Sequence, residues 1–339
     1  MTGELIMNLH LLKPKMILMK KSMSWLFSLM LLGSVITFTA CDNDDETPTP
    51  AESNTIVDYV LGDDNFSLLR DAVVKAELDG VLSGEGPFTV FAPDNAAFQA
   101  FLNDIGTNTI ENTPKDALVA VLTNHVLSGD IKSGDLSTGY FSTLSATGFG
   151  DATTSIYINL DNGVTINGTA SVKAADVAVD NGVIHVVDQV IGLPSIVTFA
   201  LADPNFSSLV AALTADGLST NFVEVLSGEG PFTVFAPTND AFQALLDSDP
   251  NWNSVADIPT NVLETVLLYH VTGAGNVRST DLTDDMVVTT LASGETFSID
   301  LDPATPTIIA GGNTAQIIAT DVQAVNGVIH AINTVILPE

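Results

Sequence analysis

Four histidines at matched positions in the two halves of the chain have the clearest capacity for chemistry. They are His125, His185, His270 and His330. Two histidines can contribute to a zinc site, but a catalytic zinc usually has three protein ligands, and the sequence contains no HExxH or CxxC motif. The alternative is that the ring nitrogens hydrogen-bond to backbone groups in a packed core, because buried polar groups normally have such partners. We therefore predict structural histidines, with neither a metal nor a cofactor.

Motifs for nucleophilic or phosphate chemistry are missing from the sequence. It has no GxSxG elbow, no GxxxxGK[ST] loop and no GxGxxG that opens a helix. The carboxylate pairs Asp63-Asp64 and Asp284-Asp285 could in principle serve acid–base catalysis. They lie in segments that we expect to be solvated loops, and a chain with 41 Asp and Glu contains such pairs by chance. We predict a protein without enzymatic activity.

The first forty residues have the features of a secretory signal. Lys20 and Lys21 precede an apolar run that ends in small residues before position 41. We therefore assign residues 1–40 to a signal peptide that is removed. A signal of ordinary length would begin at Met16 or Met19, so translation is expected to start at one of these two residues.

Cys41 is the only cysteine, so the chain cannot form an intramolecular disulfide. It directly follows Thr39-Ala40 at the end of the apolar run, which resembles the lipobox of bacterial lipoproteins. That pattern prefers Leu where this chain has Phe38. The resemblance implies that the Cys41 thiol carries lipid and tethers the protein to a membrane without spanning it. The alternative is a free thiol in an uncleaved membrane anchor.

Residues 41–53 and the overall charge indicate an extracellular protein. The segment after Cys41 is acidic, rich in proline and free of large apolar residues, as expected of a spacer. It is similar to the surface-export signals of Bacteroidota lipoproteins, although a generic solvated linker has the same composition. Without residues 1–40 the chain has six Lys and Arg against 40 Asp and Glu, a formal charge of −34. Such a surface repels nucleic acid.

A long repeat divides the rest of the chain into two domains. SGEGPFTVFAPDNAAFQAF at residues 83–101 returns as SGEGPFTVFAPTNDAFQAL at residues 227–245, an offset of 144 residues. Solenoid repeats are about 20–50 residues long, so this offset indicates duplication of a whole domain. We place the first domain at residues 54–194 and the second at residues 195–339.

We expect each domain to have an α+β organisation. Residues 55–82 have apolar side chains at helical spacing, and we expect Asp64 or Asn65 to cap the second helix there. FTVFAP has little polar face, which predicts a central strand that is covered on both sides. A helix within TPKDALVAVLTNHVL that ends at His125 follows, and short alternating segments then predict a series of strands.

The repeated blocks resemble the fasciclin (FAS1) domain. TVFAPDNAAF and TVFAPTNDAF, the Asn-His and Tyr-His pairs at the helix ends, and NGVIHVVD and NGVIHAIN occur in the order of that family. The resemblance implies two tandem fasciclin-like domains, each a β-sheet wedge with a helical cluster. The motif residues that we expect to be mostly structural are Thr89, Phe91, Pro93, Asn95, Phe98, Asn181, Gly182, His185, Thr233, Phe235, Pro237, Asn239, Phe242, Asn326, Gly327 and His330.

The resemblance also implies a role in cell adhesion. In some fasciclin proteins the Tyr-His region is linked to integrin recognition, and Tyr269-His270 matches it residue for residue. In the first domain Asn124 precedes His125 in place of tyrosine. These four residues form the predicted adhesion motif. The expected partner is an extracellular protein or glycan.

The most specific hypothesis is a lipid-anchored, non-enzymatic adhesion or binding protein that faces the cell surface at the outer membrane. The alternative is a lipoprotein that binds a glycan or small ligand for a nutrient-uptake system. An exposed aromatic platform would favour the alternative, and Trp252 in DPNWNS is its best candidate. Trp252 could instead cover the helix beneath it.

Overall fold

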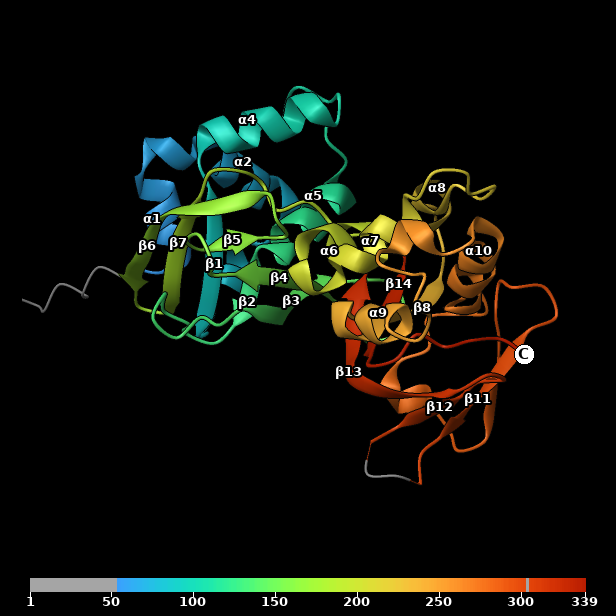
Figure 1. Ribbon diagram of the computed structural model, residues 1–339. Helices are drawn as coiled ribbons and strands as arrows, with labels where there is room; N and C mark the ends of the chain where they lie inside the picture. Colours follow the sequence, from blue (N-terminus) through green and yellow to red (C-terminus); the bar gives the residue numbers. More distant parts are fainter. Residues whose placement is uncertain (1–53, 303–304) are drawn as a thin grey trace, which may run out of the picture. The chain divides into compact units, whose positions relative to one another are not determined.

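A computed structural model of the chain describes residues 54–302 and 305–339 (Figure 1). The predicted signal peptide, the lipidation site Cys41 and the spacer at residues 41–53 lie outside the described residues. Within the described part, no single helix is long and apolar enough to cross a membrane. One pair of helical segments, Ile196–Ala202 and Pro204–Leu213, passes that test together, with a bend of 98° between them.

The first domain contains a helical cluster and a closed ring of strands. Figure 1 shows the labels α2 and α4 close together on one side of the strands. The helical segments of the described chain here are α1 (Ile56–Gly62), η1 (Asp64–Phe66), α2 (Ser67–Ala76), α3 (Asp79–Leu82), α4 (Asn95–Asp104) and α5 (Lys115–Asn124). The strands are β1 (Phe88–Pro93), β2 (Val126–Ser128), β3 (Gly139–Ala146), β4 (Thr153–Asn159), β5 (Thr165–Ile166), β6 (Ala170–Val179) and β7 (Gly182–Val187).

These seven strands pair in sequence order, and β1 closes the barrel by pairing with β7. The β1–β7 pairing is parallel and the other pairings are antiparallel. In this domain the β-sheet of the expected wedge closes into a barrel. Closure leaves the sheet without an open edge.

The second domain repeats the plan with an open sheet. Its strands run in the order β10-β11-β12-β13-β14-β8-β9, and β8 and β14 are parallel. The helical segments are α6 (Ile196–Ala202), η2 (Pro204–Phe206), α7 (Ser207–Leu213), α8 (Phe222–Leu226), α9 (Asn239–Leu246), η3 (Val255–Asp257), α10 (Thr260–Tyr269) and η4 (Ser279–Asp281). The strands are β8 (Phe232–Pro237), β9 (Val271–Thr272), β10 (Met286–Thr289), β11 (Thr296–Asp300), β12 (Thr307–Ile309), β13 (Thr314–Ala324) and β14 (Gly327–Ile332).

The FTVFAP strand is central and covered on both sides, which confirms the prediction from its composition. In β1, Val90 and Ala92 pack against the helical cluster. Phe91 points the other way and packs with Ile156 and Ile158 inside the barrel. Successive side chains of a strand face opposite sides, so a strand between two cores needs apolar residues at both.

Aspartate side chains cap helical segments at two points of the first domain. Asp94 caps α4, because its side chain accepts a hydrogen bond from the Ala97 backbone N–H. The predicted cap of the second helix at Asp64 or Asn65 is wrong. Asp63 caps η1 instead, and α2 follows directly, with Phe66 at its N-cap position. A short 3₁₀ turn before the α-helix moved the capping residue upstream.

Candidate functional site

The histidine at the end of α5 holds backbone groups of the first domain. His125 is buried, and its Nδ1–H donates to the Val121 carbonyl oxygen at 2.7 Å. Its Nε2 accepts a hydrogen bond from the Ile191 N–H at 2.8 Å. Burial lowers the pKa of His125 to about 4, so the ring is neutral at pH 7. Both ring nitrogens are therefore committed to the backbone.

His270 repeats this arrangement at the end of α10. Its Nδ1–H donates to the Val266 carbonyl oxygen at 2.6 Å, and its Nε2 accepts from the Ile336 N–H at 3.0 Å. Burial again lowers the pKa to about 4. In both domains the ring joins a helix end to the segment that follows the last strand.

The histidines of the last strands are used in the same manner. His185 on β7 donates through Nε2 to the Ile131 carbonyl oxygen at 2.9 Å, and its Nδ1 accepts from the Asp176 N–H at 3.3 Å. His330 makes the equivalent bond to the Val277 carbonyl oxygen at 2.9 Å. Burial lowers the pKa of His330. Each of the four rings holds the backbone, as the structural alternative expected, and neither ring nitrogen has a free lone pair for a metal.

A metal centre is not assembled among residues 54–302 and 305–339. No group of three or more His, Cys, Asp or Glu side chains there could hold a metal ion. The histidine rings that the repeat keeps are held in the interior by backbone bonds. Their arrangement can stabilise the fold but presents no reactive atom to a substrate.

The asparagine of each NGVIH block links distant parts of its domain. The side-chain oxygen of Asn181 accepts from the Ile56 N–H at 2.9 Å, and its amide donates to the carbonyl oxygens of Leu82 and Gly84. Asn326 makes the equivalent three bonds in the second domain. Both side chains are buried. One side chain thus joins the first helix, the end of α3 and the last strand.

The glycine after each asparagine is required by a close approach of two strands. Gly182 has φ +151°, and a Cβ there would lie 1.9 Å from the Phe88 carbonyl oxygen. The second domain has the same contact between Gly327 and Phe232, at 2.1 Å. Any larger residue would separate the parallel pair of strands.

The polar residues of the TVFAP blocks tie loops to the central strand. The Thr89 hydroxyl donates to the Gly129 carbonyl oxygen at 2.7 Å and accepts from the Ile131 N–H at 2.9 Å. The Asn95 side chain accepts from the Leu68 N–H at 3.0 Å. The equivalent bonds occur in the second domain at Thr233 and Asn239. The aromatic and proline members of these blocks are buried: Phe91, Pro93, Phe98, Phe235, Pro237 and Phe242.

The residues of the predicted adhesion motif lie in the interior. Tyr269 and Asn124 are 0% exposed, His125 is 2% exposed and His270 is 3% exposed. The Tyr269 hydroxyl donates to the Thr296 carbonyl oxygen at 2.8 Å. These four side chains present no surface to a partner in this conformation. Their direct contact with an adhesion partner stays a prediction, and their burial does not favour it.

Asn124 and Tyr269 occupy matching positions but make different contacts in the core. Asn124 makes hydrogen bonds, whereas the Tyr269 ring packs against another aromatic ring. The Asn124 amide donates to the carbonyl oxygens of Ile191 and Gly192, both at 3.2 Å, and its oxygen accepts from the Thr154 hydroxyl at 2.6 Å. The tyrosine ring instead packs edge-on against Phe297 at 5.8 Å between centroids. The difference between the repeats at this position is a difference of core packing.

Trp252 is half-buried and packs against the main hydrophobic core of the second domain. This is the covering role that the sequence left open for it. Trp252 therefore does not provide an exposed platform for stacking.

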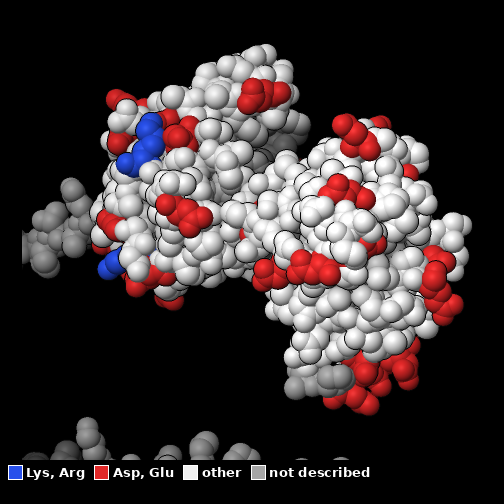
Figure 2. Space-filling view, viewed as in Figure 1, with Lys and Arg blue, Asp and Glu red and all other residues white. Residues whose placement is uncertain are grey.

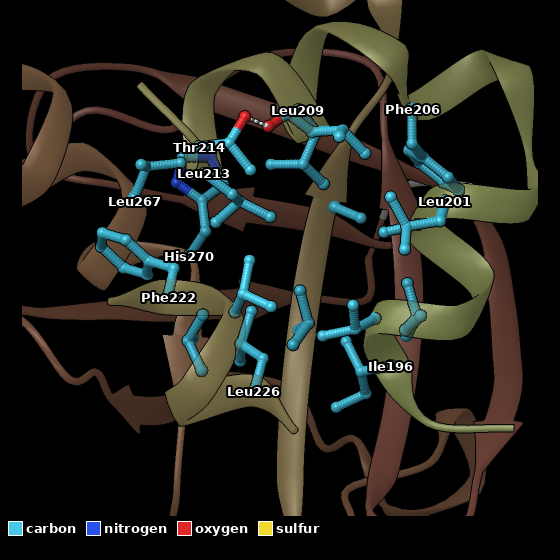
Figure 3. Close-up of a pocket in the computed structure, with 18 of the residues that line it drawn as sticks. Ile196, Leu201, Phe206, Leu209, Leu213, Thr214, Phe222, Leu226, Leu267 and His270 are labelled. Atoms are coloured by element: carbon cyan, nitrogen blue, oxygen red, sulfur yellow. Dashed lines mark hydrogen bonds between the residues drawn. The ribbon is translucent and has the colours of Figure 1, made fainter. Parts of the chain in front are cut away.

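The second domain carries an apolar groove that the sequence analysis did not identify. Figure 3 shows it with Ile196, Leu201 and Phe206 on one side and Phe222, Leu267 and His270 on the other. Helices α6, α7 and α8 and strand β8 supply its walls, and the free space inside is about 70 Å³. Leu201 is 67% exposed and Val223 is 40% exposed at its rim.

One sequence signal could have indicated this groove. The segment IVTFALA of α6 is apolar around almost its whole circumference. A helix of this kind is normally buried on all sides, so an exposed one marks surface that is available for contact.

The equivalent cleft of the first domain has a different character. It lies between α1, α2 and α3, and its walls include the charged side chains of Arg70 and Asp79. Arg70 stands at the position of Val210, since each is the fourth residue of its helix, α2 or α7. Duplication has therefore produced one cleft with charged walls and one apolar groove.

The comparisons with known proteins agree with this architecture. The fasciclin domain model matches residues 64–194 and 204–338. Protein sll1483 of Synechocystis is 43% identical over 137 residues, which cover 40% of this chain and 72% of that protein. Transforming growth factor-beta-induced protein ig-h3 of Sus scrofa is 26% identical over 301 residues, or 83% of this chain and 38% of that protein.

A solved structure has the same fold. The FAS1 domain pair of the insect cell adhesion molecule Fasciclin I aligns with a TM-score of 0.51 at 19% identity, covering 80% of this chain and 97% of that one. Two α+β domains, built from the same blocks in the same order, define a tandem-domain protein. The chain belongs to the fasciclin family, with two copies of its domain.

Proposed function

We propose that this chain is a surface-anchored, non-enzymatic adhesion or extracellular binding protein that acts through its two fasciclin domains. The observation that carries the proposal is the contrast between the motif residues and the groove. The four motif histidines, together with Asn181 and Asn326, are buried and hydrogen-bonded to the backbone. The exposed apolar surface of the second domain is free to contact another molecule.

The known proteins support the adhesive part of the proposal. The solved domain pair comes from a protein described as an insect cell adhesion molecule. Two domains on one tether also raise the effective concentration of the second contact after the first has formed.

The tether itself rests on the sequence. A signal over residues 1–40, lipid on Cys41 and an acidic spacer over residues 41–53 would hold both domains outside the cell, at the outer membrane. Replacing Cys41 with Ser tests this part. The variant should lose incorporation of a radiolabelled or clickable fatty acid and leave the membrane fraction, while retention of both would contradict the anchor.

The alternative of a glycan-binding uptake protein is less well supported. Sugar platforms expose aromatic rings, whereas each aromatic side chain in the described part of the chain is buried or half-buried. The second domain instead exposes aliphatic side chains at the groove.

A binding screen tests the proposed function. The chain without residues 1–41 retains all four described hydrophobic cores, so it is immobilised and exposed to matrix proteins, glycans and whole cells. We expect selective capture of a protein or of cells that display it. Selective capture of glycans alone would establish the alternative, and capture of nothing across a broad panel would contradict the proposal.

A further inference from the structure

The walls of the groove in the second domain offer no free hydrogen-bonding group. The Thr214 hydroxyl donates to the Val210 carbonyl oxygen at 2.8 Å (Figure 3). Both ring nitrogens of His270 are bonded to the backbone. The other lining residues are aliphatic or phenylalanine. Whatever occupies this groove must therefore present hydrocarbon to it, because a polar group there would lose its hydrogen bonds to water.

The size of the groove indicates what kind of hydrocarbon fits. Pockets for small organic ligands usually measure about 300–1,000 Å³. The free space here is about 70 Å³, which suits the end of one aliphatic side chain. Leu201 and Val223 extend the apolar surface beyond this space, at the rim. This shape fits a peptide segment that inserts an anchor residue and lays further apolar side chains over the rim.

The charge around the groove indicates the polar face of that segment. The second domain contains 17 Asp and Glu but a single basic residue, Arg278. Exposed Glu224 on α8 directly follows the rim residue Val223, and exposed Asp216 lies just beyond the end of α7. Figure 2 shows acidic side chains and neither Lys nor Arg on the visible face of this domain.

A further acidic residue, Glu264 of α10, is hydrogen-bonded to the loop between α7 and α8. Glu264 accepts hydrogen bonds from the Ser219 and Thr220 hydroxyls, and these bonds lower its pKa to about 2. It therefore remains charged at any physiological pH. Negative charge beside an apolar groove favours a partner with apolar and cationic faces.

We propose that the groove between α6, α7 and α8 binds an amphipathic basic segment of a partner protein. An aliphatic side chain of that segment enters between Leu201 and Phe222, and its Lys and Arg side chains lie toward Glu224. This site rests on the proposed binding function and names the class of partner for it. The first domain does not share the site, because the charged side chains of Asp58, Arg70 and Asp79 interrupt the apolar wall of its cleft.

The test uses designed peptides as probes and a matched pair of variants. The first probe is a helix-forming Leu–Lys peptide of about five turns, with the leucines on one face. The second replaces each Lys with Glu, and the third scrambles the first so that it has no apolar face. The Leu201→Asp variant changes the groove, and the Leu61→Asp variant changes the equivalent position of the first domain, where Leu61 is 47% exposed.

Fluorescence anisotropy should show that the amphipathic Leu–Lys peptide binds and that the Leu–Glu and scrambled peptides do not. Leu201→Asp should weaken binding by at least about ten-fold, whereas Leu61→Asp should change it less than about two-fold. Leu201→Asp adds a negative charge, so purely electrostatic attraction would be strengthened by it. Unchanged or tighter binding by this variant, or equal binding of the scrambled peptide, would overturn the proposal. Melting curves confirm that both variants fold.

Two further arms separate the alternatives. Sedimentation with neutral phosphatidylcholine vesicles, lost in Leu201→Asp, would identify a lipid surface as the occupant and overturn the proposal. In the partner screen, a Leu201→Asp chain that captures the partner as well as the original chain would overturn the groove site and leave the proposed function standing. A chain that captures no partner at all would contradict the proposed function, whatever the peptides do.

Discussion

Arg70 and Val210 occupy the same position in the two repeats, and each lines the cleft of its own domain. One residue places a guanidinium in the cleft of the first domain, while the other completes an apolar wall in the second. The duplicated fold has kept its internal bonds and changed this surface. Under the proposed function, this difference would give the two domains different binding preferences.

Val210→Arg should abolish binding of the amphipathic basic peptide. The helix position tolerates arginine, because α2 carries Arg70 there. The fold should therefore persist while the groove acquires a positive charge. Anisotropy should show at least about a ten-fold loss of affinity. Arg70→Val is the control and should leave the affinity of the second domain unchanged, so similar losses in both variants would contradict the assignment.

The buried histidines should make stability depend on pH. Their pKa is about 4 in the folded protein for both His125 and His270, against about 6.5 in an unfolded chain. The unfolded chain therefore binds protons first as the pH falls. The contribution of the neutral rings to the free energy of unfolding is complete above pH 6.5. It declines by about 3 kcal/mol for each ring between pH 6.5 and pH 4, and it changes no further below pH 4.

Urea unfolding between pH 7.5 and pH 4 measures this dependence. A variant with both His125→Gln and His270→Gln should be less stable at pH 7.5 and should show a smaller decline over the interval from about 6.5 to 4. A decline as steep as that of the original chain would mean that other groups cause it.

Asn181→Ala and Asn326→Ala should each destabilise their domain strongly. Each asparagine makes three hydrogen bonds to buried backbone groups, and removal should lower the free energy of unfolding by roughly 2–4 kcal/mol. Urea denaturation provides the measurement. Asn112→Ala, at an exposed position, is the matched control and should cost under about 0.5 kcal/mol. Equal effects at Asn112 and Asn181 would refute the structural role.

Tyr269→Phe distinguishes a structural role of the tyrosine from a role in adhesion. The variant loses the hydrogen bond to the Thr296 carbonyl oxygen but keeps the packed ring. We expect a loss of about 1–2 kcal/mol in the free energy of unfolding and unchanged partner capture below the melting temperature. Loss of capture with unchanged stability would instead restore Tyr269 as a contact residue.

The domain plan and the central strand could be predicted from the sequence because their signals are local or repeated. FTVFAP has apolar side chains on both faces, and Phe91 and Val90 do enter two different cores. Barrel closure in the first domain could not be predicted. It depends on pairings such as Leu127 with Thr143, and nothing in either short segment specifies that register.

The structural use of the histidines followed from the lack of further ligands near them. The hydrogen-bond partners of the histidines could not be predicted. Val121 and Ile191 bind His125 through backbone groups, which every residue has. The apolar run of α6 could have indicated exposed apolar surface, but not the position of the groove. The apolar run of α6 does not reveal which of its sides α8 leaves uncovered, and the exposure of Leu201 depends on that packing.

Adhesion of cells that display the complete chain tests the central claim most directly. Cells with the original chain, with Leu201→Asp and with Leu61→Asp are compared for attachment to the partner found in the binding screen, at equal surface amounts of protein. We predict attachment by the original chain and by Leu61→Asp, and its loss with Leu201→Asp. Equal attachment by all three, or no attachment by the original chain, would contradict the account.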